Sequence, residues 1–230
     1  MSKIGGMSDA DAKTGATTGA TTGLTLDKVE IILNGDRLVA ADAHIPPGEI
    51  LTVMGPSGSG KSTLLAYVAG FLDPVFSATG RIRLNALDVT ALPPERRGMG
   101  LLFQDPLLFP HLSVGGNMMF GLTPAIKGQV ARREAVEAAL SHVGMDDFLN
   151  RDPATLSGGQ RARVALMRTL LSKPAALLLD EPFSNLDTAR RGQVRDLVFA
   201  EARQRGLPVL LVTHDAADAK AAGGPCIELA

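Results

Sequence analysis

The amino-acid sequence predicts an α/β protein with a parallel-sheet core, an N-terminal antiparallel β unit and a helical insertion. Two observations lead to this prediction. A glycine-rich loop lies between an apolar strand and a helix within residues 50–69. Short apolar runs at 99–103, 175–179 and 208–212 are typical of buried strands, and each is followed by polar residues. Because parallel strands place their carboxyl ends at one edge of a sheet, we expect the chemistry at that edge.

The composition limits the classes of protein to which the chain can belong. Its 230 residues are 45% hydrophobic and 20% charged, which is ordinary for a globular protein. A net charge of −1 argues against a sequence-independent nucleic-acid binder, so we expect no nucleic-acid partner. A single cysteine, Cys226, excludes a disulfide framework. We find neither a run near the ~18 apolar residues of a membrane span nor a secretory signal, and expect a cytoplasmic protein.

The N-terminal region divides into a low-complexity tail and a predicted β unit. Residues 1–23 are mostly Gly, Ala, Thr, Ser and Asp, so we expect a disordered tail that buries little apolar surface. Residues 24–33 and 38–45 are typical of two strands, and the turn Asn34-Gly35-Asp36 between them indicates a hairpin. We therefore expect the folded domain at 24–230, beginning with a small antiparallel unit beside the glycine-rich loop.

The rest of the chain predicts strands and helices in alternation. The segment at about 105–160 differs, because glycines and prolines interrupt its first part and a helical pattern follows at 130–143. We interpret it as a helical sub-domain inserted into the core. We expect a loop at 73–79 and an exposed turn at 93–97. The other expected strands are 80–85 and 226–229, and the other expected helices are 64–69, 161–171, 188–205 and 218–222.

The glycine-rich loop fits the phosphate-loop pattern of Gly, four residues, Gly-Lys-Ser/Thr. Glycines let the backbone curl so that N–H groups point at phosphate oxygens, and the following helix adds partial positive charge. Lys61 can reach the β- and γ-phosphates of a nucleotide, and the Ser62 hydroxyl can ligate Mg²⁺. The predicted nucleotide-binding residues are Gly55, Pro56, Ser57, Gly58, Ser59, Gly60, Lys61, Ser62 and Thr63.

Four polar side chains lie at the ends of predicted strands, where they can act on a nucleotide. Asp180 is expected to hold Mg²⁺, and Glu181 is the better candidate for the general base that polarises the attacking water. The amide oxygen of Gln104 can contact Mg²⁺ or water. The imidazole of His214 can hydrogen-bond the γ-phosphate. We assign the remaining histidines to the surface: His44, His111 and His142.

A second anion site is predicted at Ser157, Gly158 and Gly159, where a serine and two glycines begin a helix. One chain does not need two complete phosphate sites for one nucleotide. We therefore interpret this site as one that serves the nucleotide of a second copy of the chain.

In order and spacing, these motifs resemble those of the nucleotide-binding subunits of ATP-binding-cassette (ABC) transporters, over about residues 24–229. The matching motifs are Walker A (55–63), the Q-loop (Gln104), the signature sequence (156–160), Walker B with its catalytic glutamate (177–181), the D-loop (184–187) and the H-loop (His214). The resemblance implies a P-loop NTPase (RecA-like) fold with ATP and Mg²⁺ as cofactors.

The resemblance also implies an assembly. Two copies form a head-to-tail dimer around two ATP molecules, each held between Walker A of one chain and the signature of the other, so that Gln160 and Asp187 join the ATP-binding residues. Glu181 acts as the base, while His214 and Lys61 stabilise charge. The insertion grips an integral-membrane permease subunit, which places the protein peripherally on the cytoplasmic side of the inner membrane. A solute-binding protein completes such a system.

Four further stretches resemble importer ATPases of the sulfate, molybdate, iron, thiamine and polyamine group, so we expect bacterial uptake of a small solute. They are residues 93–97, 103–105, 108–110 and 112–114. One alternative is an ABC-type ATPase acting as a non-transport interaction or mechanical module, although this chain lacks the sustained heptads of that class. Another is an unrelated phosphate-loop kinase or GTPase, against which the signature sequence argues.

Two further expectations concern surfaces. The family's adenine-stacking position falls near Leu33, and no aromatic residue precedes Walker A. Without a stacking ring the base should be recognised weakly, so we expect the affinity for GTP to lie within about tenfold of the affinity for ATP. The first part of the insertion is rich in apolar residues, of which we expect a subset to line a groove for a membrane-subunit helix. These residues are Leu107, Leu108, Phe109, Met118, Met119 and Phe120.

Overall fold

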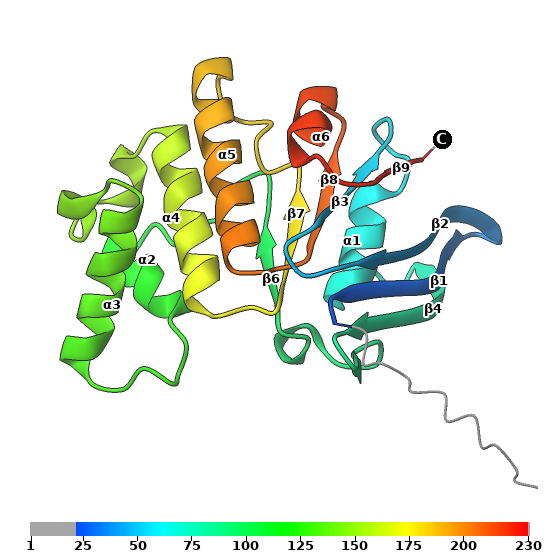
Figure 1. Ribbon diagram of the computed structural model, residues 1–230, viewed down its shortest axis with the longest axis horizontal. Coiled ribbons are helices and arrows are strands. Elements are labelled where there is room, and N and C mark those ends of the chain that lie inside the picture. The colour runs from blue at the N-terminus through cyan, green and yellow to red at the C-terminus, as the bar shows by residue number, and fades with distance from the viewer. Residues whose placement is uncertain (1–21, 230) are drawn as a thin grey trace, which may run out of the picture.

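The computed structural model describes residues 22–229, so the expected disorder of 1–23 lies almost wholly outside the described residues. The described chain forms two β-sheets flanked by helices (Figure 1). The strands are β1 (Leu24–Leu33), β2 (Asp36–Ile45), β3 (Ile50–Met54), β4 (Phe76–Leu84), β5 (Leu87–Asp88), β6 (Met99–Leu102), β7 (Ala176–Asp180), β8 (Val209–Thr213) and β9 (Cys226–Glu228). The α-helices are α1 (Lys61–Ala69), α2 (Val114–Gly121), α3 (Gln129–His142), α4 (Gly158–Leu171), α5 (Thr188–Gln204) and α6 (Ala216–Ala222).

The central sheet is parallel, with the strand order β6-β7-β8-β3-β9. Strand β3, which leads into the phosphate loop, pairs with β8, and β8 pairs with β7. The carboxyl ends of these strands therefore meet at one edge, where Met54, Asp180 and Thr213 end their strands. This arrangement confirms the predicted α/β fold and brings the strand-end polar residues together.

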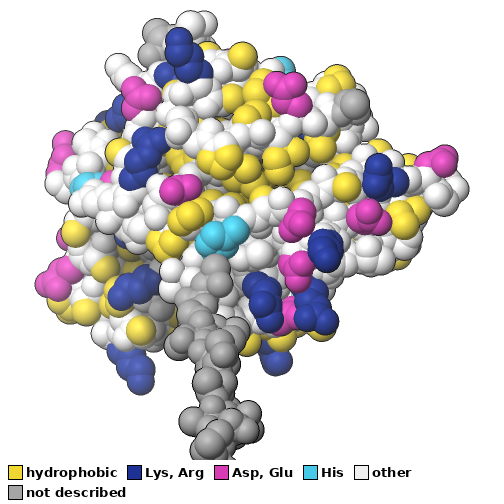
Figure 2. All heavy atoms as spheres, turned by 45° about the vertical axis from the view of Figure 1, so that its right-hand side comes forward, with side chains coloured by type: hydrophobic (Ala, Val, Ile, Leu, Met, Phe, Trp, Pro, Cys, Tyr) yellow, Lys and Arg dark blue, Asp and Glu magenta, His cyan; other side chains and the backbone are white. Residues whose placement is uncertain are grey.

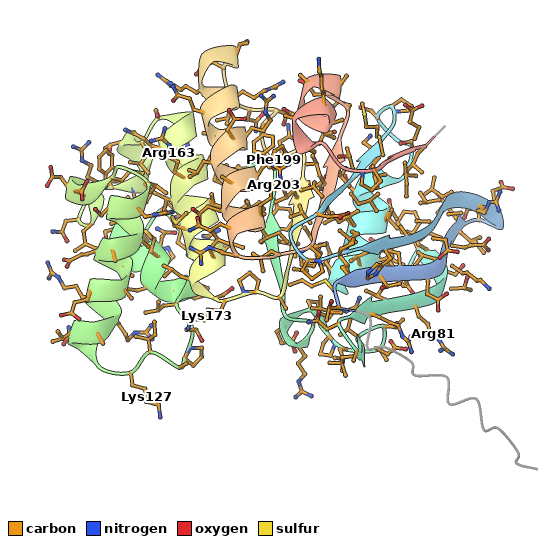
Figure 3. The ribbon with its side chains drawn as sticks, in the orientation of Figure 1. Arg81, Lys127, Arg163, Lys173, Phe199 and Arg203 are labelled. Atoms are coloured by element: carbon orange, nitrogen blue, oxygen red, sulfur yellow. The ribbon has the colours of Figure 1, made fainter. Side chains whose placement is uncertain are left out.

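The parallel sheet separates two hydrophobic cores, because successive side chains of a strand point to opposite faces. Leu177 and Leu179 of β7 pack in the core that contains α4 and α5, whereas Ala176 and Leu178 pack in the core that contains α1 and the antiparallel sheet. In Figure 3, Phe199 is labelled on α5; its ring meets that of Phe183 edge-on at 5.7 Å. Fully buried strands explain the continuous apolar runs in the sequence.

The antiparallel sheet has the order β2-β1-β4-β5 and confirms the predicted N-terminal hairpin. Strand β4 is longer than expected, however. It begins at Phe76, so the loop predicted at 73–79 is wrong in its second half. Ser77 pairs with Ile32 and Thr79 with Glu30, because main-chain pairing with β1 does not require apolar side chains on the exposed face.

The sequence predicts an exposed turn before β6, but its last residue, Arg97, is buried with 5% exposure. Its guanidinium donates to the carbonyls of Tyr67 and Val68 at 2.8 Å, and also to those of Thr90 and Leu92. The last turn of a helix leaves carbonyls without partners, and here Arg97 satisfies two of them in α1. The sequence does not indicate this burial, because these acceptors come together only in the folded chain.

The inserted helices α2 and α3 pack against α4 and form the left-hand part of the molecule in Figure 1. A contact between α3 and α5 helps to join them to the core. The Nε2 atom of His142, in the last turn of α3, lies 2.5 Å from Oε1 of the buried Glu201 on α5. The surface assignment of His142 is therefore only half right, since its side chain is 48% exposed but paired with a buried carboxylate.

Among the described helices, none is both long and apolar enough to cross a bilayer.

The outer surface carries charges of both signs. Figure 2 shows lysine and arginine side chains interspersed with acidic ones on the face turned to the viewer, together with a band of apolar side chains. Arg81 of β4 lies on the antiparallel-sheet side of the molecule in Figure 3. The expectation that nucleic acid is not a partner stays a prediction.

Candidate functional site

The phosphate loop is held in shape by its glycines and its lysine. Gly60 has a φ of 87°, and a Cβ atom there would lie 2.3 Å from Cγ2 of Val39, so only glycine fits against β2. The ammonium of Lys61 donates to the carbonyls of Gly55 at 2.8 Å and Pro56 at 2.7 Å. These bonds hold a buried cation at the start of α1, beside the helix N-terminus that attracts anions.

Ser62 and Asp180, which are both predicted to hold Mg²⁺, meet across the site. The Ser62 hydroxyl donates to Oδ1 of Asp180 at 3.0 Å, although 118 residues separate them. Burial raises the pKa of the Asp180 carboxyl, and nearby Glu181 adds to this, while the Ser62 hydrogen bond and Lys61 oppose it. A hydroxyl and a carboxylate are the oxygen ligands that Mg²⁺ prefers, so this pair fits the ion. Its binding here remains a proposal.

Glu181 and His214 form the second pair. His214 Nδ1 lies 3.0 Å from Oε2 of Glu181, and the imidazole is more exposed than the carboxylate. The backbone of Glu181 has a φ of 44°, which is unusual for a residue other than glycine. Its N–H donates to the carbonyl of Val212 at 2.9 Å, which fixes this conformation next to β8. The geometry places a carboxylate and an imidazole together at the same sheet edge.

Gln104 lies just beyond β6 and contacts the segment that follows Glu181. Its side-chain amide donates to Oδ1 of Asn185 at 3.3 Å, and the Asn185 amide donates back to the main-chain carbonyl of Gln104 at 3.3 Å. Neither hydrogen bond uses the side-chain oxygen of Gln104, which is the atom predicted to contact Mg²⁺. The sequence did not indicate Asn185 as a partner, since 81 residues separate the two.

The signature segment forms the start of α4 and is satisfied within itself. The Ser157 hydroxyl accepts from the Gln160 N–H, and Oε1 of Gln160 accepts from the Ser157 N–H at 2.9 Å, which is a capping box. Asp187 is the N-cap of α5, where its carboxylate accepts from the Arg190 N–H. Among the hydrogen bonds of residues 22–229, none joins these caps to the phosphate loop, and in Figure 1 α5 lies between α4 and α1.

A groove of about 650 Å³ lies between the edge strand β6, α2 and α4. The sequence predicts that part of the apolar set in 105–123 lines such a groove, and this is confirmed for Leu107, Phe109 and Phe120. Phe120 is 70% exposed and meets Phe109 edge-on at 4.7 Å, whereas Met118 is fully buried in the core. The occupant of the groove remains a proposal.

A parallel sheet with a phosphate loop, a paired hydroxyl and carboxylate, and a glutamate–histidine pair at one edge defines a phosphate-loop nucleotide hydrolase. A profile of the ABC transporter family matches residues 38–184. The chain belongs to this family. It is an ABC ATPase, the ATP-binding subunit of a transporter, so the kinase, GTPase and non-transport alternatives are not favoured.

Individual relatives agree with this conclusion. The chain is 49% identical over 199 residues to "Uncharacterized ABC transporter ATP-binding protein YnjD" of Escherichia coli, covering 86% of this chain and 91% of that protein. It is 45% identical over 172 residues to the thiamine import ATP-binding protein ThiQ of Shigella sonnei, covering 75% and 73%. It is 48% identical over 179 residues to the spermidine/putrescine import ATP-binding protein PotA of Frankia alni, covering 77% of this chain but 38% of that relative.

Proposed function

We propose that the chain works as a head-to-tail dimer that encloses two ATP molecules and drives the uptake of a small solute through separate permease subunits. The observation that carries this proposal is the separation of the two anion sites. The phosphate loop begins α1, the signature begins α4, and no described hydrogen bond joins them. A second copy, turned head to tail, would bring the signature of one chain to the phosphate loop of the other.

The proposed hydrolysis uses residues that meet at the sheet edge. Glu181 accepts a proton from the water that attacks the γ-phosphate in line, and His214 beside it hydrogen-bonds that phosphate. Lys61 neutralises charge on the β- and γ-phosphates. Ser62 and Asp180, with Gln104, would hold Mg²⁺, which when bound offsets the negative charge that develops on the phosphate oxygens.

The direction of transport and the location rest on the relatives. ThiQ and PotA are named import ATP-binding proteins, which supports uptake by a system of this kind. Import through a membrane requires permease subunits, and the apolar groove lined by Phe109 and Phe120 suits a helix from such a subunit. The chain would then lie peripherally at the cytoplasmic side of the inner membrane, and a solute-binding protein would deliver the solute.

The dimer is tested with Glu181→Gln. This variant keeps the phosphate contacts but cannot activate water, so with ATP and Mg²⁺ it should accumulate as a dimer in light scattering, while the same protein without nucleotide stays monomeric. The control is the double variant that adds Ser157→Arg, which should bind ATP but remain monomeric. A monomeric Glu181→Gln protein with nucleotide bound would contradict the dimer for the isolated chain.

A further inference from the structure

One arginine outside the motifs contacts both segments that carry the Glu181–His214 pair. Arg191 lies in the first turn of α5, and its guanidinium reaches back over the segment that follows Glu181. Its Nε donates to the carbonyl of Phe183 at 3.1 Å and its Nη2 to that of Ser184 at 3.3 Å. Its Nη1 donates to the carboxylate of Asp215 in an ion pair, and Asp215 is the residue that follows His214.

The partners of Arg191 are themselves fixed, so the guanidinium joins two rigid segments. Phe183 is 1% exposed and packs in the core. Asp215 uses its other carboxylate oxygen to accept the N–H of Ala217 at 2.7 Å, and its own N–H donates to Oγ1 of Thr213 at 3.0 Å. Arg191 therefore supplies a direct link between two segments that are each anchored only locally, and losing it would leave their separation without this link.

The chemistry of the side chain matters as well as its charge. Three acceptors in two directions suit the planar fork of an arginine, whereas a lysine ammonium cannot hold both backbone carbonyls and the carboxylate in one plane. The side chains of Arg191 and Asp215 are 25% and 28% exposed, so the ion pair is partly shielded from water. Nearby on the same helix, Arg195 contacts Asp218 and the carbonyl of Ala217 but neither catalytic segment.

We propose that Arg191 is a positioning residue that sets the separation between the Glu181 carboxylate and the His214 imidazole. The inference rests on the proposed roles of these two residues in hydrolysis. Arg191 joins the loop after Walker B to the H-loop through three contacts. It does not contact the phosphate loop in the described structure, so its effect should fall on turnover rather than on nucleotide binding.

The test uses the purified full chain with ATP and Mg²⁺. Arg191→Lys should lower kcat by about tenfold or more and leave KM for ATP within about twofold, because geometry at the reacting atoms changes but phosphate contacts do not. Asp215→Asn keeps the α6 cap and removes one acceptor, so kcat should fall in the same direction. Arg195→Lys is the matched control and should keep the kcat of the original protein.

A structural role is separated from a positioning role in the Glu181→Gln background. If Arg191 acts through Glu181, adding Arg191→Lys should change the residual rate by less than about twofold, since residues that act as a unit are non-additive. An equal further loss in that background, or a folded Arg191→Lys protein with unchanged kcat, would overturn the inference. If Arg191→Lys does not fold, an unchanged kcat in folded Asp215→Asn overturns it. Full turnover by Glu181→Gln itself would instead contradict the proposed base.

Discussion

The phosphate loop and the start of α4 are both helix N-termini suited to an anion, but they are built in different ways. At the phosphate loop, Lys61 is tied to its own loop, and Ser62 reaches Asp180 from another strand. At α4, Ser157 and Gln160 satisfy each other within one turn. The first site depends on the sheet edge for its completion, whereas the second is a self-contained turn. This difference indicates that α4 can present its site to another molecule without rearranging the core.

The largest expected effect separates these two sites. Lys61→Ala should weaken ATP binding by the monomer by about 2 kcal/mol, because it removes the cation that is proposed to contact the phosphates. Ser157→Arg should leave monomer affinity for ATP within about twofold, since the site is proposed to serve a second chain, but lower turnover by about a hundredfold or more. Nucleotide titration of dilute protein and phosphate release at higher concentration measure the two quantities.

The control for this pair is Ser141→Arg, which places the same charge on an exposed serine of α3. It should change neither binding nor turnover. Equal loss of monomer affinity in Lys61→Ala and Ser157→Arg would mean that the signature does not act across two chains, and the comparison between the sites would fail.

The next prediction concerns the groove beside the insertion. Phe120→Asp should greatly reduce the fraction of the chain that sediments with native membranes, because a charge at the proposed apolar docking surface costs binding energy, while the purified ATPase rate stays within about twofold. Val130→Asp is the control, since Val130 is equally exposed at 72% but does not line the groove. Unchanged membrane association of Phe120→Asp would exclude the groove as the docking surface.

A smaller effect is expected where the insertion joins the core. Burial raises the pKa of Glu201. Hydrogen bonds from His142 and Arg205, together with the charges of these two side chains, lower it by more than burial raises it. The pKa of Glu201 therefore lies below its usual range. A carboxyl with a depressed folded-state pKa stabilises the fold above its unfolded pKa of about 4.3, and this contribution is lost as pH falls through the folded value. Glu201→Gln should therefore cost about 2 kcal/mol at pH 7 and less below pH 4.

Urea unfolding at both pH values measures this difference. Glu137→Gln is the control, because Glu137 pairs with Arg133 on the exposed face of α3 and should contribute less than about 1 kcal/mol. A Glu201→Gln difference that does not shrink at low pH would show that the carboxylate does not stabilise the joint through its charge.

The smallest effect concerns the adenine. Leu33 ends β1 and is half-buried, so an aliphatic side chain at the expected position would cover the base without stacking. Leu33→Tyr should tighten ATP binding by about 1 kcal/mol, roughly fivefold, while the original chain accepts GTP within about tenfold of ATP. Titration of both proteins with ATP and with GTP measures the two affinities. An ATP preference above about a hundredfold would show that another group recognises the base.

The register of the antiparallel sheet supplies a control that the sequence could not indicate. Phe76 pairs directly with Leu33 across β1 and β4, so the two side chains lie on the same face. Sequence analysis considered only aromatic residues that precede Walker A, and it placed Phe76, which follows Walker A, in a loop. Phe76→Leu should weaken ATP binding if this ring contributes to the base site, and leave it unchanged if Leu33 alone covers the adenine.

Local patterns predicted the fold well, and long-range contacts explain what they missed. The phosphate loop and the buried strands depend on neighbouring residues, so the sequence indicates them directly. The burial of Arg97 depends on carbonyls at the end of α1, some 30 residues earlier. The contacts between Gln104 and Asn185 and between His142 and Glu201 likewise join distant segments. No local periodicity encodes such pairings, because each partner looks like an ordinary polar surface residue.

The left-handed backbone at Glu181 has a consequence for engineering. A residue with a side chain in this conformation costs about 1 kcal/mol or more relative to glycine. A library screened only for resistance to heat would therefore favour glycine at this position and recover robust proteins without the proposed base. Thermostable variants of this chain need a screen that retains hydrolysis, since the local replacement that relieves most strain is also the one that removes the proposed base.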